Sequence, residues 1–149
     1  MAFPFLACML ATAELHHVPP RALVAIQSVE GGQVHMASRN ADGSEDLGPM
    51  QVNTQWLERL AVRSGLDARQ VRVRLMDDPC FNIDAAGFIL RLELDAAHGD
   101  LLTAIGHYHS HTPEIAMSYR VRVIQAAWSL FYRKRPAPGA GPQRANGAG

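Results

Sequence analysis

One stretch constrains the fold of this chain more than any other: residues 19–32, which read Pro-Pro-Arg-Ala-Leu-Val-Ala-Ile-Gln-Ser-Val-Glu-Gly-Gly. A proline in the first turn of a helix gives up only an N–H group that has no partner there, and a glycine pair stops a helix. The stretch therefore predicts a helix that begins near Pro20 and ends at Glu30. Leu23, Ile26 and Glu30 fall at positions i, i+3 and i+7, so a carboxylate occupies the apolar stripe that should face the core.

The setting of Glu30 predicts an unusual pKa. Partial burial disfavours the charged form of a carboxyl group, and the negative end of the helix dipole lies beside it. Both effects raise the pKa, and a carboxylic acid that stays protonated near neutral pH is suited to general acid catalysis. The alternative is a glutamate at a helix terminus whose side chain turns out to water. This stretch alone leaves both interpretations open.

The rest of the chain predicts a mainly α-helical domain with a small irregular β-hairpin region. The hairpin signal is the turn sequence Asn-Ala-Asp-Gly-Ser at residues 40–44. Residues 67–76, in which valines and a leucine alternate loosely, receive no assignment. Caps and apolar stripes place helices at about residues 5–16, 20–30, 53–64, 79–94, 101–107 and 113–130.

Single residues on these stripes add detail. Gly87 lies on the apolar side of the helix that starts at Pro79, which predicts the close approach of another backbone. Tyr119 lies on the apolar face of the last helix, among alanines, valine and leucine. Trp56 and Trp128 also lie on or near apolar stripes, so both are predicted to belong to the core.

Length and charge bound the class of protein. With 149 residues the chain is expected to form one domain over residues 1–135, followed by a disordered Pro/Gly/Ala-rich tail at 136–149. Fourteen acidic residues balance fourteen basic ones, so no strong overall field favours nucleic acid as a partner. The basic residues near the end of the last helix are interpreted as a solvated face, and no stable membrane insertion is expected.

Three alternating histidines, His107, His109 and His111, raise the question of a metal site. Three residues at a spacing of two are poorly placed to converge at a helix end, and no cysteine or acidic partner joins them in the sequence. The prediction is therefore no metal and no cofactor.

Two further motifs follow Glu30 and its hairpin. Residues 46–53 read Asp-Leu-Gly-Pro-Met-Gln-Val-Asn, and residues 78–83 read Asp-Pro-Cys-Phe-Asn-Ile. The order of all these motifs resembles the soluble lytic transglycosylase family of the lysozyme superfamily. Within it, the chain is similar to the small enzymes that accompany conjugation, pilus and type III or IV secretion machines. The resemblance covers about residues 5–132 and implies an α+β lysozyme-like fold.

The resemblance also implies roles for individual residues. Glu30 matches the single catalytic acid of the family. Four residues match positions that line the sugar cleft: Met50, Gln51, Asn53 and Tyr108.

The two cysteines, Cys8 and Cys80, allow either one disulfide or two buried thiols when read from the sequence alone. The resemblance implies the disulfide of periplasmic members, which closes a loop of about 70 residues and adds about 4 kcal/mol in the chain-entropy model. The apolar N-terminus has no basic residue before it and makes an unconvincing signal peptide. A periplasmic location then requires a start upstream of Met1; otherwise the chain stays in the cytoplasm.

Three positions depart from the family pattern. Gly31 replaces the serine that usually follows the catalytic glutamate, which removes a hydroxyl group near the reaction. Pro49 replaces a leucine and stiffens the loop that contains Gln51. His109 replaces the asparagine that usually follows the cleft tyrosine.

The function implied is cleavage of the MurNAc–GlcNAc β-1,4 bond of peptidoglycan with formation of 1,6-anhydro-MurNAc ends. Glu30 would protonate the glycosidic oxygen and then take a proton from the muramic acid 6-hydroxyl. A hydrolytic muramidase is the nearest alternative, with Asp42, Glu45 or Asp46 as the second carboxylate. A peptidoglycan-binding assembly factor is the other. Expected partners are glycan strands and components of a secretion or conjugation apparatus.

Overall fold

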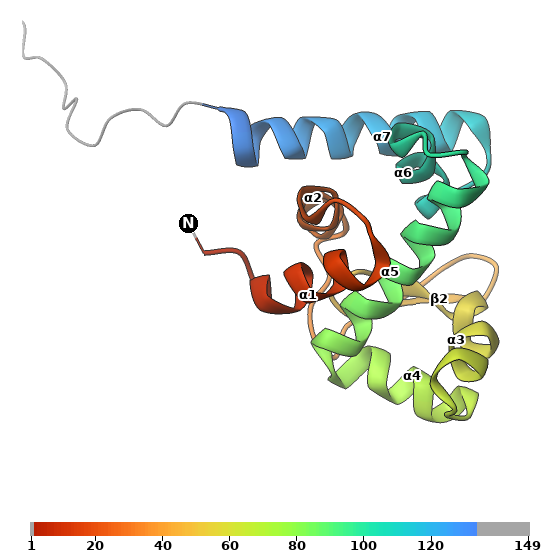
Figure 1. Cartoon of the computed structure of the whole chain (residues 1–149). Helices are drawn as coiled ribbons and strands as arrows, with labels where there is room; N and C mark the ends of the chain where they lie inside the picture. Colours follow the sequence, from red (N-terminus) through yellow and green to blue (C-terminus); the bar gives the residue numbers. More distant parts are fainter. Residues whose placement is uncertain (1, 134–149) are drawn as a thin grey trace, which may run out of the picture.

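The computed structural model of the chain describes residues 2–133, which form seven α-helices and a small antiparallel sheet (Figure 1). The mainly helical, lysozyme-like fold predicted from the sequence is confirmed. The helices are α1 (Leu6–His16), α2 (Pro20–Glu30), α3 (Leu57–Ser64), α4 (Ala68–Asp77), α5 (Pro79–Ala96), α6 (Leu101–His109) and α7 (Pro113–Ala127), with a 3-10 turn at Thr54–Trp56 and a π-helical turn at Trp128–Tyr132. The strands are β1 (Ala37–Arg39), β2 (Glu45–Leu47) and β3 (Val52–Asn53), paired in the order β1-β2-β3.

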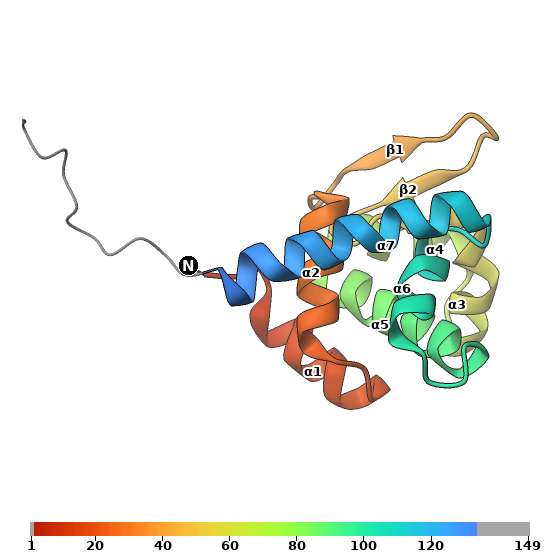
Figure 2. The same ribbon diagram turned by 90° about the horizontal axis from the view of Figure 1, so that it is seen from above.

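Helix α5 runs through the middle of the molecule and packs against α1, α4 and α6 (Figure 1). Helix α7 packs across α2 and α6. Figure 2 shows the β1–β2 hairpin at the edge of the helices, on the opposite side from α1. The C-terminal end of α2 therefore lies where the other helices meet the hairpin.

Helix α2 has the bounds that its sequence predicts. Pro20 stands in its first turn, and Glu30 is its last residue. Gly31 caps it with a left-handed φ of 62°, and the Gly31 N–H group donates to the carbonyl oxygen of Gln27 at 2.9 Å. Leu23 is fully buried. The apolar side of α2 thus anchors Glu30 at the boundary of the core.

Helix α4 occupies the segment that received no assignment. Asp67 and Gln70 form a capping box, in which each backbone N–H group donates to the other residue's side chain. Val71 and Leu75, four positions apart, are fully buried, whereas Val73 is exposed. The alternation of Val71, Val73 and Leu75 resembles a strand only because Val73, between two buried residues, faces solvent.

The close approach predicted at Gly87 is present, but the neighbour is a pair of side chains. A Cβ atom at Gly87 would lie 2.2 Å from Thr12 Cγ2 and 3.0 Å from His16 Cδ2, both on α1. The expected contact with a backbone is wrong. Only glycine lets α1 pack this closely on α5 at that point.

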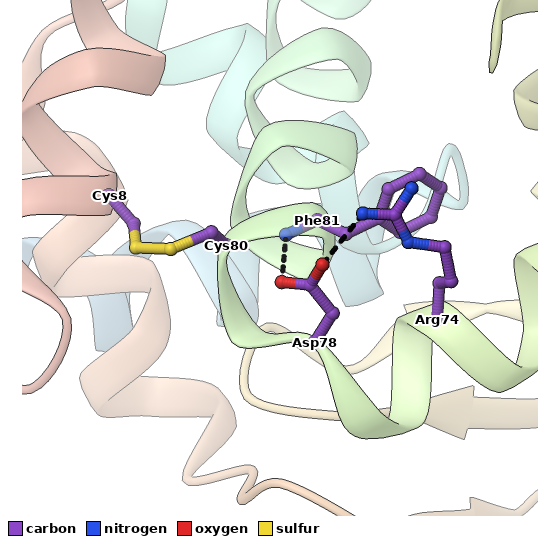
Figure 3. Close-up of a disulfide and its surroundings, with 5 residues drawn as sticks. All are labelled: Cys8, Arg74, Asp78, Cys80 and Phe81. Carbon is purple, nitrogen blue, oxygen red and sulfur yellow. Dashed lines mark hydrogen bonds and ion pairs between the residues drawn. A yellow bond between two sulfur atoms is a disulfide. The ribbon is translucent and has the colours of Figure 1, made fainter.

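The disulfide between Cys8 and Cys80 joins α1 to the first turn of α5 (Figure 3). Asp78 caps α5: its carboxylate accepts from the Phe81 N–H group at 3.0 Å and from Arg74 Nη2 at 2.7 Å. The Arg74 guanidinium lies 4.5 Å from the centroid of the Phe81 ring. The Cys8–Cys80 pairing that the family resemblance implies is confirmed by this disulfide.

Two other predictions need correction. Trp128 is 63% exposed and stacks on Tyr132, so it is no core residue. Helix α6 continues to His109, two residues beyond the predicted end at His107. The tail predicted at 136–149 lies outside the described residues. Within residues 2–133, no helix is both long and apolar enough to cross a bilayer.

Candidate active site

Glu30 projects from the end of α2 and meets a tyrosine from α7. The Tyr119 hydroxyl group donates a hydrogen bond to Glu30 Oε1 at 2.6 Å. Tyr119 itself is 1% exposed. The hydroxyl group fixes one carboxyl oxygen, so the interpretation of Glu30 as a side chain that turns out to water is wrong.

Burial raises the pKa of Glu30 from 4.5 to about 7, and it is the largest of the influences on this group. The hydrogen bond from Tyr119 lowers the pKa, the nearby carboxylate of Asp46 raises it, and the guanidinium of Arg122 lowers it. Desolvation therefore outweighs the hydrogen bond, as the position of Glu30 on an apolar stripe predicts. The carboxyl group is about half protonated at neutral pH.

Glu30 lines a cavity of about 410 Å³ between the helices and the hairpin. Three of the four residues predicted to line the sugar cleft are here as well: Gln51, Asn53 and Tyr108. The remaining lining residues are Asn40, Asp42, Ser44, Asp46, Val52, Gln55, Ile89, His109, Ser110 and Ile115.

Met50, the fourth predicted cleft residue, is fully buried and points into the core. Its backbone groups contact residues that shape the cleft. Its N–H group donates to Asn82 Oδ1 at 2.8 Å, and its carbonyl oxygen accepts from the Tyr108 hydroxyl group at 3.1 Å. The Tyr108 side chain is therefore held to the loop between β2 and β3.

Asn82 fixes that loop to α5. It is fully buried, and its Nδ2 group donates to the carbonyl oxygens of Leu47 and Leu75 at 2.8 and 2.9 Å. Together with the bond from Met50, these contacts satisfy the side-chain amide at a fully buried position. Asn82, from the motif at residues 78–83, thus fixes the loop that contributes Gln51 to the cleft wall, although its own side chain lies in the core.

Gln51 and Asn53 are held by short-range hydrogen bonds. Gln51 has a φ of 50°, and its Nε2 group donates to the Gly48 carbonyl oxygen at 2.9 Å. Asn53 Nδ2 donates to Ser44 Oγ at 3.0 Å and to Asp46 Oδ1 at 2.9 Å. Both side chains are preorganised at the cavity wall.

The three acidic residues near the hairpin take different positions. Asp42 and Asp46 line the cavity with Glu30. The Asp46 carboxylate accepts from Asn53 on one oxygen and from Asn40 Nδ2, at 3.1 Å, on the other. Glu45 is absent from the cavity lining and pairs with Arg72 at 2.6 Å.

His109 stands in the cleft where the family has an asparagine. Its ring stacks on the Tyr119 ring, with centroids 4.5 Å apart and an angle of 7° between the planes. Burial lowers the pKa of His109, and Arg122 lowers it further. The imidazole ring covers the tyrosine that contacts Glu30.

A second cavity of about 520 Å³ adjoins the first and shares Gln55, Tyr108, His109 and Ser110 with it. Trp56 and Arg59 form part of its wall. Trp56, predicted to belong to the core, is half-buried and faces this cavity.

Glu93, His107 and His111 also line the second cavity. Their ligand atoms, one from each residue, all lie within 4.8 Å of one another. The expectation that no acidic residue joins the histidines is therefore wrong. The third member of the alternating set, His109, turns instead towards Tyr119.

The sequence profile described as "Transglycosylase SLT domain" matches residues 7–119, which is more than half of the chain. The chain belongs to this family. SLT-domain proteins act on peptidoglycan, and the resemblance inferred from Glu30 and its downstream motifs is confirmed.

The SLT family member called invasion protein IagB, from Salmonella typhimurium strain SL1344, is 30% identical to this chain over 128 residues. The matched region covers 85% of this chain and 76% of IagB. The IagB proteins of Salmonella typhimurium strain LT2 and of Salmonella typhi give the same values.

Sequence reasoning missed the parts of the SLT site that depend on tertiary contacts. Tyr119 is 89 positions from Glu30. The only sequence signal for its role is that it places a hydroxyl group on an otherwise aliphatic helix face. The sequence places Asn82 in the motif at residues 78–83 but predicts no role for it. A buried amide in the first turn of an apolar helix needs partners, and that requirement points to a structural hydrogen-bonding role.

Proposed function

We propose that this protein is a lytic transglycosylase that cleaves the MurNAc–GlcNAc β-1,4 bond of peptidoglycan and leaves 1,6-anhydro-MurNAc ends. The observation that supports this most is the carboxyl group of Glu30, which lines a cavity and has a pKa of about 7. A group that is half protonated at neutral pH can both give and accept a proton within one turnover.

Glu30 first donates its proton to the glycosidic oxygen, and the bond between that oxygen and C1 of the muramic acid breaks. The 6-hydroxyl group of the same sugar then attacks C1, and Glu30 takes the proton released from it. Because the Tyr119 hydroxyl group occupies Oε1, the transferred proton belongs to Oε2. The 2-acetamido group of the substrate assists the departure of the leaving group.

A hydrolytic muramidase is the second candidate, since Asp46 lines the cavity with Glu30. Such an enzyme needs a second carboxylate as nucleophile or as base for water. Each oxygen of Asp46 already accepts a hydrogen bond from an asparagine amide. These contacts reduce the nucleophilicity of Asp46 and favour the transglycosylase, in which the substrate supplies the nucleophile.

The proposed location is the periplasm, where disulfides such as Cys8–Cys80 persist. There the enzyme would open the cell wall locally for a secretion or conjugation apparatus. The IagB relatives are named invasion proteins, and that name supports this role. A peptidoglycan-binding assembly factor without catalysis remains the alternative to an enzyme in this role.

The test is the digestion of purified sacculi by the wild type and by Glu30→Gln, followed by mass spectrometry of the soluble fragments. Glu58→Gln, which changes an exposed glutamate on α3, is the matched control. Anhydromuropeptides from the wild type and the control, reduced at least about 100-fold in Glu30→Gln, are expected.

The other outcomes separate the alternatives. Reducing ends in place of anhydro ends, together with their loss in Asp46→Asn, would identify a muramidase. No soluble fragments from a wild type that still sediments with sacculi would identify a binding factor. Either result would overturn the proposal.

A further inference from the structure

The side chains of Glu93, His107 and His111 come from three parts of the fold. Glu93 lies near the end of α5, His107 lies in the last turn of α6, and His111 lies in the link to α7. His111 Nε2 is 3.0 Å from Glu93 Oε1, and His107 Nδ1 is 3.9 Å from Glu93 Oε2. The two imidazole rings stack with centroids 4.3 Å apart.

These separations fit a small metal ion. Ligand atoms at about 2.0–2.1 Å from a tetrahedral zinc ion lie about 3.3 Å from one another. The two distances from Glu93 to the histidines are on either side of that value. The separations among the three ligand atoms reach up to 4.8 Å, so binding of one ion requires the two stacked rings to rotate and draw the side chains together.

The charge of Glu93 points the same way. The residue is 7% exposed, and a buried carboxylate is costly unless positive charge compensates it. Within residues 2–133 its ion-pair contacts are with the two histidines alone, and no arginine joins them. Arg59 lines the same cavity, but its guanidinium lies over the Trp56 ring, 5.3 Å from the centroid.

We infer that Glu93, His107 and His111 form a binding site for one divalent transition-metal ion of the zinc type. Two imidazoles and one carboxylate suit Zn²⁺, whereas Mg²⁺ and Ca²⁺ prefer oxygen ligands throughout. Three protein ligands leave a fourth position for water or another ligand, and the adjoining cavity of about 520 Å³ provides room for it.

The ion would tie α5 to the segment that joins α6 and α7. His107 and His111 flank Tyr108, His109 and Ser110, which line both cavities. Binding of the ion therefore restrains one wall of the cleft that contains Glu30. The binding itself is independent of the proposed catalysis.

The test uses tag-free protein, freed of metal by a chelator and titrated with Zn²⁺ against a chromogenic competitor. We expect one ion per chain. Loss of an outer partner of a metal ligand costs about 10–100-fold in affinity, and loss of a ligand costs more. His111→Gln and Glu93→Gln should therefore each lower the affinity by more than about 100-fold.

His98→Asn is the matched control, because His98 is exposed just beyond α5 and asparagine tolerates its φ of 51°. It should bind Zn²⁺ as the wild type does, and a hundredfold excess of Mg²⁺ should not compete. Co²⁺ in place of Zn²⁺ should give the visible absorption of a tetrahedral nitrogen and oxygen site in the wild type and in His98→Asn, but not in His111→Gln.

Absence of saturable binding at one ion per chain would overturn the inference, as would equal affinity in the wild type and in His111→Gln. His111 is exposed, so this variant keeps its fold even if Glu93→Gln does not. Glu30→Gln should bind Zn²⁺ normally, so a failure of the catalytic proposal would leave this result unaffected.

Discussion

A single hydrogen bond and the burial around it set the chemistry of Glu30. Its pKa of about 7 follows first from burial, and Tyr119 holds the carboxyl group in place at 2.6 Å. The raised pKa could be predicted from the sequence, because an acid on an apolar stripe is desolvated wherever the rest of the chain packs. Tyr119 as the partner could not be predicted, since no local pattern connects two helices 89 positions apart.

Glu30 should make the stability of the protein depend on pH. Its pKa is about 7 in the folded state and 4.5 without burial, so its contribution is fully present below pH 4.5 and is lost as the pH rises through 7. Glu30→Gln removes the cost of burying an ionised carboxylate at high pH. The free energy of unfolding of Glu30→Gln minus that of the wild type should be about 2 kcal/mol larger at pH 8 than at pH 5, so the variant gains relative stability as the pH rises.

Urea unfolding at the two pH values measures this difference, with Glu58→Gln as the control that should show none. A Glu30→Gln effect of the same size at both pH values would contradict the raised pKa.

Tyr119→Phe should move the pH profile of cleavage. The hydrogen bond from Tyr119 lowers the pKa of Glu30, so its loss should shift the alkaline limb upwards by about 1 pH unit. The maximal rate should fall about tenfold, because the carboxyl group loses its fixed orientation. Rates of sacculus digestion from pH 5 to pH 9 give both quantities.

Tyr132→Phe controls for the loss of a tyrosine hydroxyl group, since Tyr132 contacts Arg21 at the far end of the last helix. A lower rate in Tyr119→Phe with an unmoved alkaline limb would mean that Tyr119 only supports the fold.

At the scale of the elements, the sequence predicts those with strong terminal signals. Pro20 with Gly31, and Asp78 with Pro79, mark the ends of α2 and the start of α5 where the structure has them. Helix α4 was missed because the spacing of its valines resembles a strand, although the capping box at Asp67 was readable. The placement of the β2–β3 loop depends on Asn82, whose bonds reach across 35 positions.

Asn82→Ala should be one of the most damaging substitutions in the fold. It removes three buried hydrogen bonds, one from the Met50 N–H group and two to the carbonyl oxygens of Leu47 and Leu75. The free energy of unfolding should fall by about 3–5 kcal/mol. Chemical unfolding followed by circular dichroism measures the loss.

Asn40→Ala is the comparison, because Asn40 makes its side-chain bonds in the half-buried hairpin and should cost about 1 kcal/mol. Equal losses in the two variants would refute a structural role for the buried amide.

At the scale of the whole molecule, one covalent bond limits the freedom of the unfolded chain. Cys8 and Cys80 are 72 positions apart, and their bond brings the first helix against the central one. That separation, and hence the size of the constraint, was known from the sequence. The Glu93 cluster could not be predicted, because it forms where α5, α6 and the link to α7 meet.

Replacement of both cysteines, Cys8→Ser with Cys80→Ser, should lower the free energy of unfolding by about 4 kcal/mol. Neither cysteine lines the cavities beside Glu30 or Glu93, so the specific activity of the folded variant should stay within about twofold of the wild type. Urea unfolding with and without a reductant measures the effect, and the double variant should not respond to the reductant. A wild type that is equally stable in both buffers would contradict this prediction.

The packing of α7 on α2 also sets the time at which the active site forms during synthesis. Glu30 leaves the ribosome 89 residues before Tyr119, and domains fold as their segments become available. Until α7 docks, Glu30 lacks both the hydroxyl group that orients it and part of the cover that raises its pKa. A nascent chain therefore contains a glutamate without its partner and cover, and the proposed capacity to cut glycan strands would be acquired only when the last helix is in place.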